Sequence, residues 1–233
     1  YDWLWLMDDD AEPKEDALKI LSLYFKNGDV VGLTGSVVLL DGNIAIDCIG
    51  KINLKDIFPR LQTPLNLKEY QKQVIEIDTA LFVCLLVKRE AIGNIGFPKK
   101  EFFIHNDDVE YCIRLRTIGK ILLVPKSVII HKEAAKSGIE RSFLGRRSRR
   151  IEFNRFWLSY YGMRNLVWLG KQYSQNKLLF YIQMIKSLVR AILGIIIYDD
   201  HKYKRIKFLL SAYFDGLKGK FDNRKPKRIL YEE

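Results

Sequence analysis

The stretch "WLWLMDDDAEP", residues 3–13, decides how the beginning of the chain folds. It is an apolar, Trp-rich run that predicts a strand and leads into three consecutive carboxylates, Asp8, Asp9 and Asp10. Adjacent like charges repel one another, and desolvation at the tip of a buried strand adds to that cost. A bound cation would remove the repulsion, so this stretch indicates that a positive partner is needed at the strand end.

Strand and helix patterns alternate after this stretch, and we expect an α/β fold. Five apolar, β-branched runs predict strands: residues 30–40, 44–50, 74–87, 120–125 and 127–132. A helix is expected from Pro13 to just before Gly28, and a short helical turn with a glycine stop over residues 89–98. A further helix should begin with Asp107 as its cap, bury Val109, Cys112 and Ile113, and end at Gly119.

Composition divides the chain into an acidic body and a basic tail. The 233 residues are 48% hydrophobic and 29% charged, which is typical of a globular protein and excludes disordered and collagen-like classes. Residues 141–233 hold 21 Lys and Arg against 7 Asp and Glu, whereas residues 1–140 hold 18 against 21. We therefore predict a catalytic domain over 1–140 and a basic, amphipathic helical tail over 141–233.

The three cysteines, Cys48, Cys84 and Cys112, are odd in number, far apart and placed in apolar runs. This pattern favours small core residues over disulfides or a zinc site, and it points to a reducing, cytoplasmic setting.

The basic tail predicts helices with one apolar face. Residues 178–198 are as long as a membrane span, yet Gln183, Lys186, Ser187 and Arg190 share one face, which favours an amphipathic helix. Basic amphipathic helices bind anionic membrane surfaces, and this is the partner we expect for the tail. A nucleic-acid role is the second alternative, but the aromatic residues follow no recognisable RNA-binding pattern, so we expect no nucleic acid.

Strand geometry places Asp8 and Asp10 on the same side, where two carboxylates can bind one Mg²⁺ or Mn²⁺ ion. The alternative is a solvated acidic turn in front of the next helix. His131 ends an apolar strand, and it is either a metal ligand or a hydrogen-bonded rim residue.

A second acidic cluster, "FFIHNDDVEY" at residues 102–111, contains Asp107, Asp108 and Glu110. Adjacent carboxylates at a helix start raise one another's pKa, which suits a general base. Helix capping is the alternative explanation, and it requires only Asp107.

The order of these motifs resembles the inverting family 2 glycosyltransferases, which have a GT-A fold. "MDDD" resembles their D-x-D metal motif, "NDDVEY" the motif with the catalytic base, and "VIIHK" the late histidine of the metal site. "YYGMRN", residues 160–165, is similar to a helix that follows the catalytic domain in bacterial members. The triple Asp followed by A-E-P most resembles galactofuranosyltransferases, with rhamnosyltransferases next.

The resemblance implies a role for each candidate residue. Asp8, Asp10 and His131 would hold Mg²⁺ or Mn²⁺, and Asp108 would be the catalytic base. The remaining candidates would bind substrate or line its pocket: Asp9, His105, Asn106, Asp107 and Glu110. The donor would be a UDP- or dTDP-linked sugar, and the acceptor a glycan or lipid-linked sugar in cell-surface polysaccharide synthesis, on the cytoplasmic face of the cell membrane.

Complete family members carry a nucleotide-binding strand–helix–strand unit before the D-x-D strand. The resemblance therefore implies a sheet that lacks its first strands here, and a chain that is inactive by itself.

Two other classes of protein use part of the same pattern. A metal-dependent phosphohydrolase or nuclease would also cluster Asp residues but usually needs ligands for a second ion. A non-catalytic basic membrane-binding protein would need no carboxylate cluster.

Overall fold

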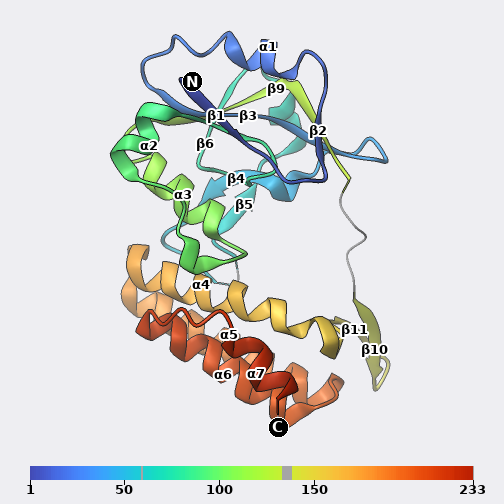
Figure 1. Ribbon diagram of the computed structural model, residues 1–233. Coiled ribbons are helices and arrows are strands. Elements are labelled where there is room, and N and C mark those ends of the chain that lie inside the picture. Colours follow the sequence, from blue (N-terminus) through green and yellow to red (C-terminus); the bar gives the residue numbers. More distant parts are fainter. Residues whose placement is uncertain (59, 133–137, 233) are drawn as a thin grey trace. The chain divides into compact units, whose positions relative to one another are not determined.

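The computed structural model describes residues 1–58, 60–132 and 138–232 (Figure 1). Two compact units divide the chain. The first draws on residues within 1–52, 62–99 and 108–134, and the second on residues within 53–61, 100–107 and 135–233. The domain boundary after residue 140 stays a prediction, because compactness also assigns two earlier segments to the second unit.

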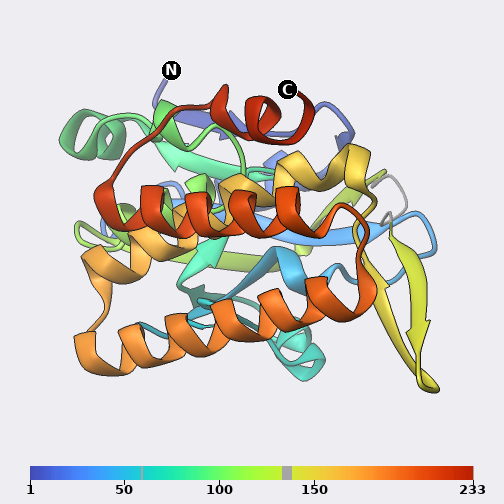
Figure 2. The same ribbon diagram turned by 90° about the horizontal axis from the view of Figure 1, so that it is seen from below.

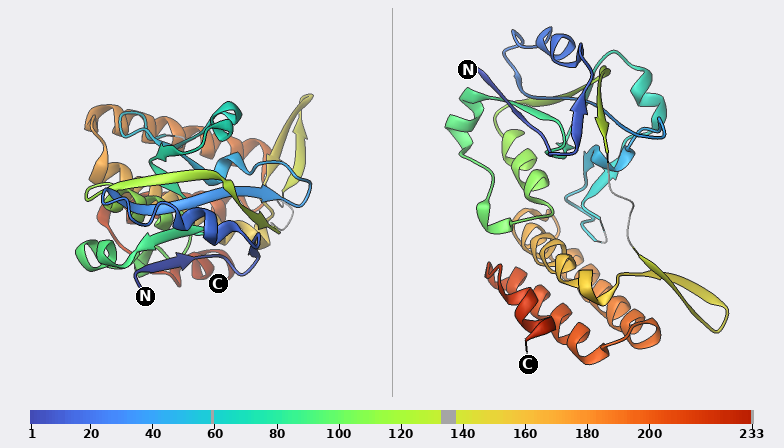
Figure 3. Two further views of the ribbon diagram at one scale, coloured as in Figure 1. Left: turned by 90° about the horizontal axis from the view of Figure 1, so that it is seen from above. Right: turned by 45° about the vertical axis from the view of Figure 1, so that its right-hand side comes forward.

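A six-stranded mixed sheet forms the centre of the first unit. The strand order is β1, β8, β3, β9, β2, with β6 pairing with β9 off this path. The strands are β1 (Trp3–Leu6), β2 (Ala11–Pro13), β3 (Val30–Leu39), β6 (Ile75–Ile77), β8 (Leu85–Lys88) and β9 (Lys120–His131). β3 and β9 run parallel and side by side (Figure 3, left), whereas β1, β2 and β6 pair antiparallel with their neighbours. The predicted α/β class is confirmed.

β9 is one strand of 12 residues, where the sequence predicts two. Pro125 suggested a break, but the strand continues through an irregularity at which its register with β3 shifts between Gly35 and Ser36. The Ser36 hydroxyl donates to the Pro125 carbonyl oxygen at 3.0 Å and so keeps that backbone acceptor bonded. A proline is tolerated at such an irregularity because it is not required to donate to the ladder.

Residues 74–87, predicted as one long strand, form three short ones. β6 pairs with β9, β7 (Thr79–Ala80) pairs with β4 (Ile49–Ile52), and β8 pairs with both β1 and β3. β4 also pairs with β5 (Gln62–Pro64), which completes a separate three-stranded sheet. Most residues of the run are apolar and buried, and apolarity alone does not show where the partner strand changes.

Three α-helices lie between strands of the sheet in the sequence: α1 (Ala17–Ser22), α2 (Arg89–Ile95) and α3 (Asp107–Leu115). The sequence places Pro13 in the first turn of a helix, but Pro13 ends β2, opposite Ile129 of β9. The chain gains an edge strand there, and α1 begins four residues later. Gly96 ends α2 with a φ of 77°, as predicted for a glycine stop. The predicted apolar face of α3 is confirmed, because Val109, Cys112 and Ile113 are buried.

Short 3₁₀ helices occur at Ile46–Cys48, Leu67–Gln71, Lys100–Phe102 and Phe153–Leu158. All three cysteines are buried, and none of them forms a disulfide in the described part of the chain, which confirms their prediction as core residues.

Four helices, α4 (Ser159–Tyr173), α5 (Lys177–Tyr198), α6 (Lys202–Lys218) and α7 (Lys225–Tyr231), make up most of the second unit (Figure 2). α6 approaches α4 closely at Gly216, where a Cβ atom would lie 2.5 Å from the Arg164 carbonyl oxygen. The sequence predicts an apolar face on α6 that contains Ile206, Leu209, Leu210, Tyr213, Phe214 and Leu217. Leu209 and Tyr213 are buried as expected, whereas Leu210 and Phe214 are exposed. Phe208 and Ala212 are also buried.

A β-hairpin formed by β10 (Ile139–Phe143) and β11 (Arg146–Arg150) precedes these helices and extends away from them (Figure 3, right). The sequence identifies residues 145–150 only as a basic run. It does not predict the hairpin, because "RRSRR" has no apolar alternation.

Candidate active site

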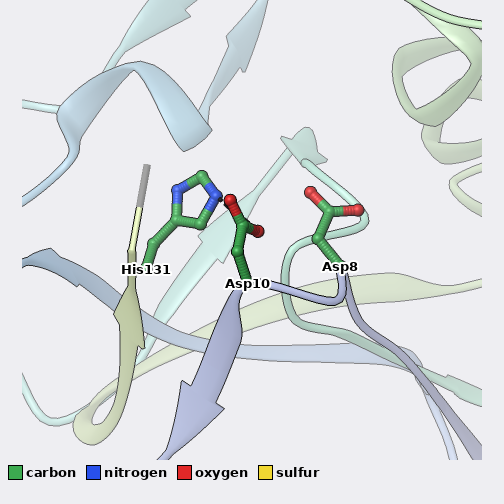
Figure 4. A group of neighbouring side chains, drawn as sticks. All are labelled: Asp8, Asp10 and His131. Carbon is green, nitrogen blue, oxygen red and sulfur yellow. Dashed lines mark ion pairs between the residues drawn. The ribbon is translucent and has the colours of Figure 1, made fainter. Parts of the chain in front are cut away.

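The geometry of β2 and β9 explains why Asp8, Asp10 and His131 meet, although they are far apart in the sequence. β2 runs antiparallel to β9 with Ala11 opposite His131, and the Lys132 amide donates to the Asp10 carbonyl oxygen at 2.9 Å. The turn between β1 and β2 is closed by the Ala11 amide, which donates to the Asp8 carbonyl oxygen at 3.2 Å. One ligand atom from each of the three side chains therefore lies within 4.8 Å of the others (Figure 4).

The side chains of this cluster have the properties of cation ligands. His131 Nε2 lies 3.2 Å from Asp10 Oδ1, and the histidine side chain is 12% exposed against 41% for Asp10. Asp8 is exposed. Within the part of the chain that the structure describes, His131 Nδ1 is buried and has no hydrogen-bond partner. Unsatisfied buried polar atoms are rare in folded proteins and are costly.

Two carboxylates and one imidazole fit a divalent cation. Carboxylate oxygens suit Mg²⁺ and Mn²⁺, and imidazole nitrogen suits transition metals. The structure thus brings together the three residues that the sequence predicts as metal ligands. Asp9, predicted to bind substrate, lies exposed in the turn between Asp8 and Asp10.

The second acidic motif lies at the start of α3. The Val109 amide donates to Asp108 Oδ1 at 2.7 Å. The sequence predicts Asp107 as the helix cap and leaves Asp108 without a structural task. The structure instead gives Asp108 a hydrogen bond from the backbone in the first turn of α3, and this bond orients the carboxylate.

Glu110, predicted to bind substrate, lies in a buried ion pair. The residue is fully buried, and Arg114 Nε donates to both of its carboxylate oxygens at 3.0 Å. Arg114 also donates to the carbonyl oxygens of Ile95 at 2.5 Å and Phe97 at 3.0 Å. The ion pair therefore helps to hold α3 against the end of α2, and a role of Glu110 toward substrate stays a prediction.

Residues 101–106 lead directly into α3 and have an unusual backbone. Phe103, His105 and Asn106 have φ values of 66°, 67° and 62°, a left-handed conformation that is strained for residues other than glycine. Burial lowers the pKa of His105, and the nearby Asp107 carboxylate opposes that shift. Such a segment persists only when its surroundings hold it in place.

Arg164 and Asn165 of α4 hold this segment. Asn165 Nδ2 donates to the carbonyl oxygens of Phe102 at 3.1 Å, Ile104 at 3.2 Å and His105 at 2.8 Å. Arg164 Nη2 donates to the carbonyl oxygens of Glu101 and Phe102, both at 3.1 Å. Both side chains are fully buried. The sequence analysis assigns no role to either residue. Their position within the aromatic run "YYGMRN" was the available signal that both side chains are buried and hydrogen-bonded.

Comparisons with known proteins bear on the fold. No family model and no curated protein sequence matches the chain. The chain is similar to a crystal structure of GalNAc-T7 with UDP, GalNAc and Mn²⁺, with a TM-score of 0.53 and 13% identity over 93% of this chain and 40% of that one. The fold resembles that of a glycosyltransferase. The chain spans about 40% of that structure, and 13% identity shows the fold alone.

A second solved structure, A197 from STIV, matches with a TM-score of 0.39 and 14% identity over 65% of this chain and 68% of that one. A score this low carries no argument about fold or function.

Proposed function

We propose that the protein is a metal-dependent glycosyltransferase that moves a sugar from a nucleotide-sugar donor to a glycan or lipid-linked acceptor. The observation that carries the proposal is the convergence of Asp8, Asp10 and His131 to within 4.8 Å, in a chain with a glycosyltransferase-like fold. The GalNAc-T7 structure was determined with UDP and Mn²⁺, which supports a cation and a nucleotide diphosphate as partners.

Asp8, Asp10 and His131 would hold the Mg²⁺ or Mn²⁺ ion. Such an ion supplies Lewis acidity that stabilises the charge on a departing nucleoside diphosphate. The two carboxylates direct their negative charge toward the same point, and His131 Nε2 offers a neutral ligand when the imidazole is deprotonated.

Asp108 would act as general base for the acceptor hydroxyl. Its Oδ1 accepts a hydrogen bond from the Val109 amide, which orients the carboxylate. Its Oδ2 would take the proton of the acceptor hydroxyl as the hydroxyl oxygen attacks the anomeric carbon. Attack from the face opposite the leaving group inverts that carbon. His105, Asn106 and Asp107 would line the acceptor pocket, and Asp9 would contact the donor.

The family 2 resemblance supports the finer assignments. We propose galactofuranose or rhamnose as the transferred sugar, UDP or dTDP as the nucleotide, and cell-surface polysaccharide synthesis as the setting. The protein would work in the cytoplasm, bound to the inner face of the cell membrane by its basic tail.

Sugar-nucleotide turnover by the complete protein tests the proposal. A panel of UDP- and dTDP-linked sugars, including UDP-galactofuranose and dTDP-rhamnose, should yield one donor that is consumed only with an acceptor and with Mg²⁺ or Mn²⁺. Chelation should abolish turnover. Metal-dependent cleavage of phosphodiesters without sugar transfer would instead support the phosphohydrolase or nuclease alternative. Vesicle binding without any turnover would support the non-catalytic alternative.

A further inference from the structure

One face of α5 is apolar and exposed along the whole helix. Leu178, Ile182, Ile185, Val189, Leu193 and Ile196 are between 41% and 72% exposed. Their spacing of three and four residues places them in one stripe, because an α-helix has 3.6 residues per turn. Large apolar side chains scattered singly on a surface are ordinary, but a continuous stripe of them marks an interaction site.

The opposite face of α5 packs against its own unit. Phe180, Met184 and Ile195 are buried, and the Phe180 ring lies 5.8 Å from the Phe58 ring. A Cβ atom on Gly170 of α4 would come within 2.1 Å of Phe180, which shows how closely α4 and α5 approach. The helix is therefore fixed to the protein by one face, and the exposed stripe is the remaining apolar surface.

Positive charge borders the stripe. Lys186 and Arg190 are exposed beside it, Lys177 begins the helix, and the sequence of α5 contains no Asp or Glu. Basic residues at the edge of an apolar face favour the anionic headgroups of a membrane.

The β10–β11 hairpin lies beside the C-terminal end of α5 (Figure 2). Arg150 Nε donates to Asp199 Oδ1 at 2.8 Å, and the Phe143 ring lies 6.4 Å from the ring of Tyr198. Phe143 and Leu144 are exposed at the turn, and Leu144 is 88% exposed. The exposed cations of β11 are Arg146, Arg147 and Arg149. The hairpin thus repeats the pattern of α5, an apolar surface bordered by positive charge.

A bilayer surface fits this pattern better than a transmembrane position or a second copy of the chain. Among the described residues, α5 is the one helix long and apolar enough to cross a membrane. Crossing would place Lys186 and Arg190 near the middle of the bilayer, where charge is costly, and would remove Phe180 from its packing. A symmetric dimer through the stripe would bring the Lys186 and Arg190 side chains of both copies close together, where like charges repel.

We propose that the outer face of α5 and the Phe143–Leu144 hairpin tip form a monotopic docking surface for an anionic lipid bilayer. The apolar stripe enters the boundary between headgroups and acyl chains, while the bordering Lys and Arg side chains contact the headgroups. This inference deepens the membrane association proposed above. It depends on neither the metal site nor sugar transfer.

Vesicle co-sedimentation of the complete protein tests the surface. The unchanged protein should bind vesicles of phosphatidylcholine mixed with phosphatidylglycerol more strongly than phosphatidylcholine alone. The double variant Ile185→Asp/Val189→Asp should lower the partition coefficient about tenfold or more, because two charges replace the centre of the apolar stripe. Leu144→Asp should cause a smaller loss. Lys186→Gln/Arg190→Gln should remove most of the preference for anionic lipid.

Leu67→Asp, on an exposed leucine of the first unit, is the matched control and should bind vesicles like the unchanged protein. Melting temperatures should be similar for all variants; if the double variant fails to fold, the single changes Ile185→Asp and Leu193→Asp replace it. Unchanged binding by a folded stripe variant would overturn the proposal. A dimer of the unchanged protein, detected by light scattering, would also overturn it if the stripe variant is monomeric and neither protein binds vesicles.

Metal affinity and transfer to a soluble acceptor should be the same for the stripe variants as for the unchanged protein. Loss of vesicle binding with transfer intact would therefore confirm the docking surface separately from the enzyme. Vesicle binding without any transfer would leave the surface in place and overturn the proposed activity.

Discussion

Two clusters of polar side chains in this protein differ in how their charges are bonded. Asp8, Asp10 and His131 in the first unit bring two carboxylates together beside an imidazole whose Nδ1 lacks a hydrogen-bond partner among the described residues. Arg164 and Asn165 in the second unit are fully buried, yet all three guanidinium nitrogens of Arg164 donate to an acceptor. The first cluster offers ligand atoms that could hold a cation, and the second is hydrogen-bonded within the protein.

The difference shows how to separate a candidate site from a structural network. Burial alone does not decide it, because Arg164 and Glu110 are the more deeply buried charges. What separates a structural network from a candidate site is whether the charged group is bonded to partners within the protein. Arg164 lies 5.2 Å and 4.9 Å from the ring centroids of Tyr161 and Phe221, so its charge is also balanced by aromatic faces. In the first cluster, Asp10 Oδ1 lies 3.2 Å from His131 Nε2.

The largest expected effect concerns Asp108, the proposed general base. Asp108→Asn keeps the size of the side chain and an oxygen that can accept the Val109 amide, but it cannot take a proton. Turnover by the complete protein should fall by about 10²–10⁴-fold, since a general base typically contributes that much. Initial rates at saturating donor and acceptor measure the effect, and donor binding should survive.

Asp107→Asn is the matched control for that variant. It should weaken acceptor binding more than it lowers turnover at saturating acceptor. If Asp107→Asn is the more damaging change to turnover, the two roles are exchanged. If neither change matters, the second acidic motif is structural and the proposed mechanism is wrong.

The next largest effect concerns the hydrogen-bonded cluster of Arg164 and Asn165. Arg164→Met keeps an apolar stem but removes the guanidinium donors to the Asn165 and Asn223 side-chain oxygens and to the Glu101 carbonyl oxygen, while the Phe102 carbonyl keeps its Asn165 donor. We expect the free energy of unfolding to fall by about 3 kcal/mol, because acceptors that lose a donor inside the protein keep their desolvation cost. Arg164→Lys should rescue little, since one ammonium cannot reproduce a planar fork. Urea unfolding measures both.

Arg155→Met is the control, on an exposed arginine of the same unit, and should change stability by less than about 0.5 kcal/mol. If Arg164→Met is as mild as this control, the network around residues 101–106 does not stabilise the fold as described.

The smallest effect concerns thiol chemistry. Burial raises the pKa of Cys84 to about 11 and that of Cys112 to about 12. Alkylation requires the thiolate, so both cysteines should remain unmodified by iodoacetamide near pH 8 and react once urea unfolds the protein. Mass spectrometry of the labelled peptides measures this. Rapid labelling of native Cys84 would show that the core around it is open.

Much of the first unit could be predicted from the sequence because local signals agree with the tertiary contacts. Leu6 and the carboxylates after it mark a strand end, Gly96 marks a helix stop, and the buried face of α3 follows helical spacing. The convergence of Asp10 and His131 was predictable only from the order of the motifs, since β2 brings them together by pairing with β9.

Other features depend on contacts that no local pattern encodes. Residues 74–87 change partner strand twice within one apolar run. The strand Arg146–Arg150 is stabilised by pairing with β10 and by the ion pair between Arg150 and Asp199, not by its own propensity, and Arg141 of β10 forms an ion pair with Asp200. The aromatic run around Arg164 indicates a buried polar role, but its partners could not be predicted, because most of its acceptors lie far away in the sequence.

Mn²⁺ binding to the complete protein tests the central claim most directly. Isothermal titration without nucleotide should detect one ion, and Asp8→Ala, Asp10→Ala and His131→Ala should each weaken its affinity by about tenfold or more, because each removes one ligand atom from the cluster. Glu90→Gln, on an exposed carboxylate of α2, should leave the affinity unchanged. Equal Mn²⁺ affinity in the unchanged protein and in all three ligand variants would contradict the account and show that this cluster is not a metal site.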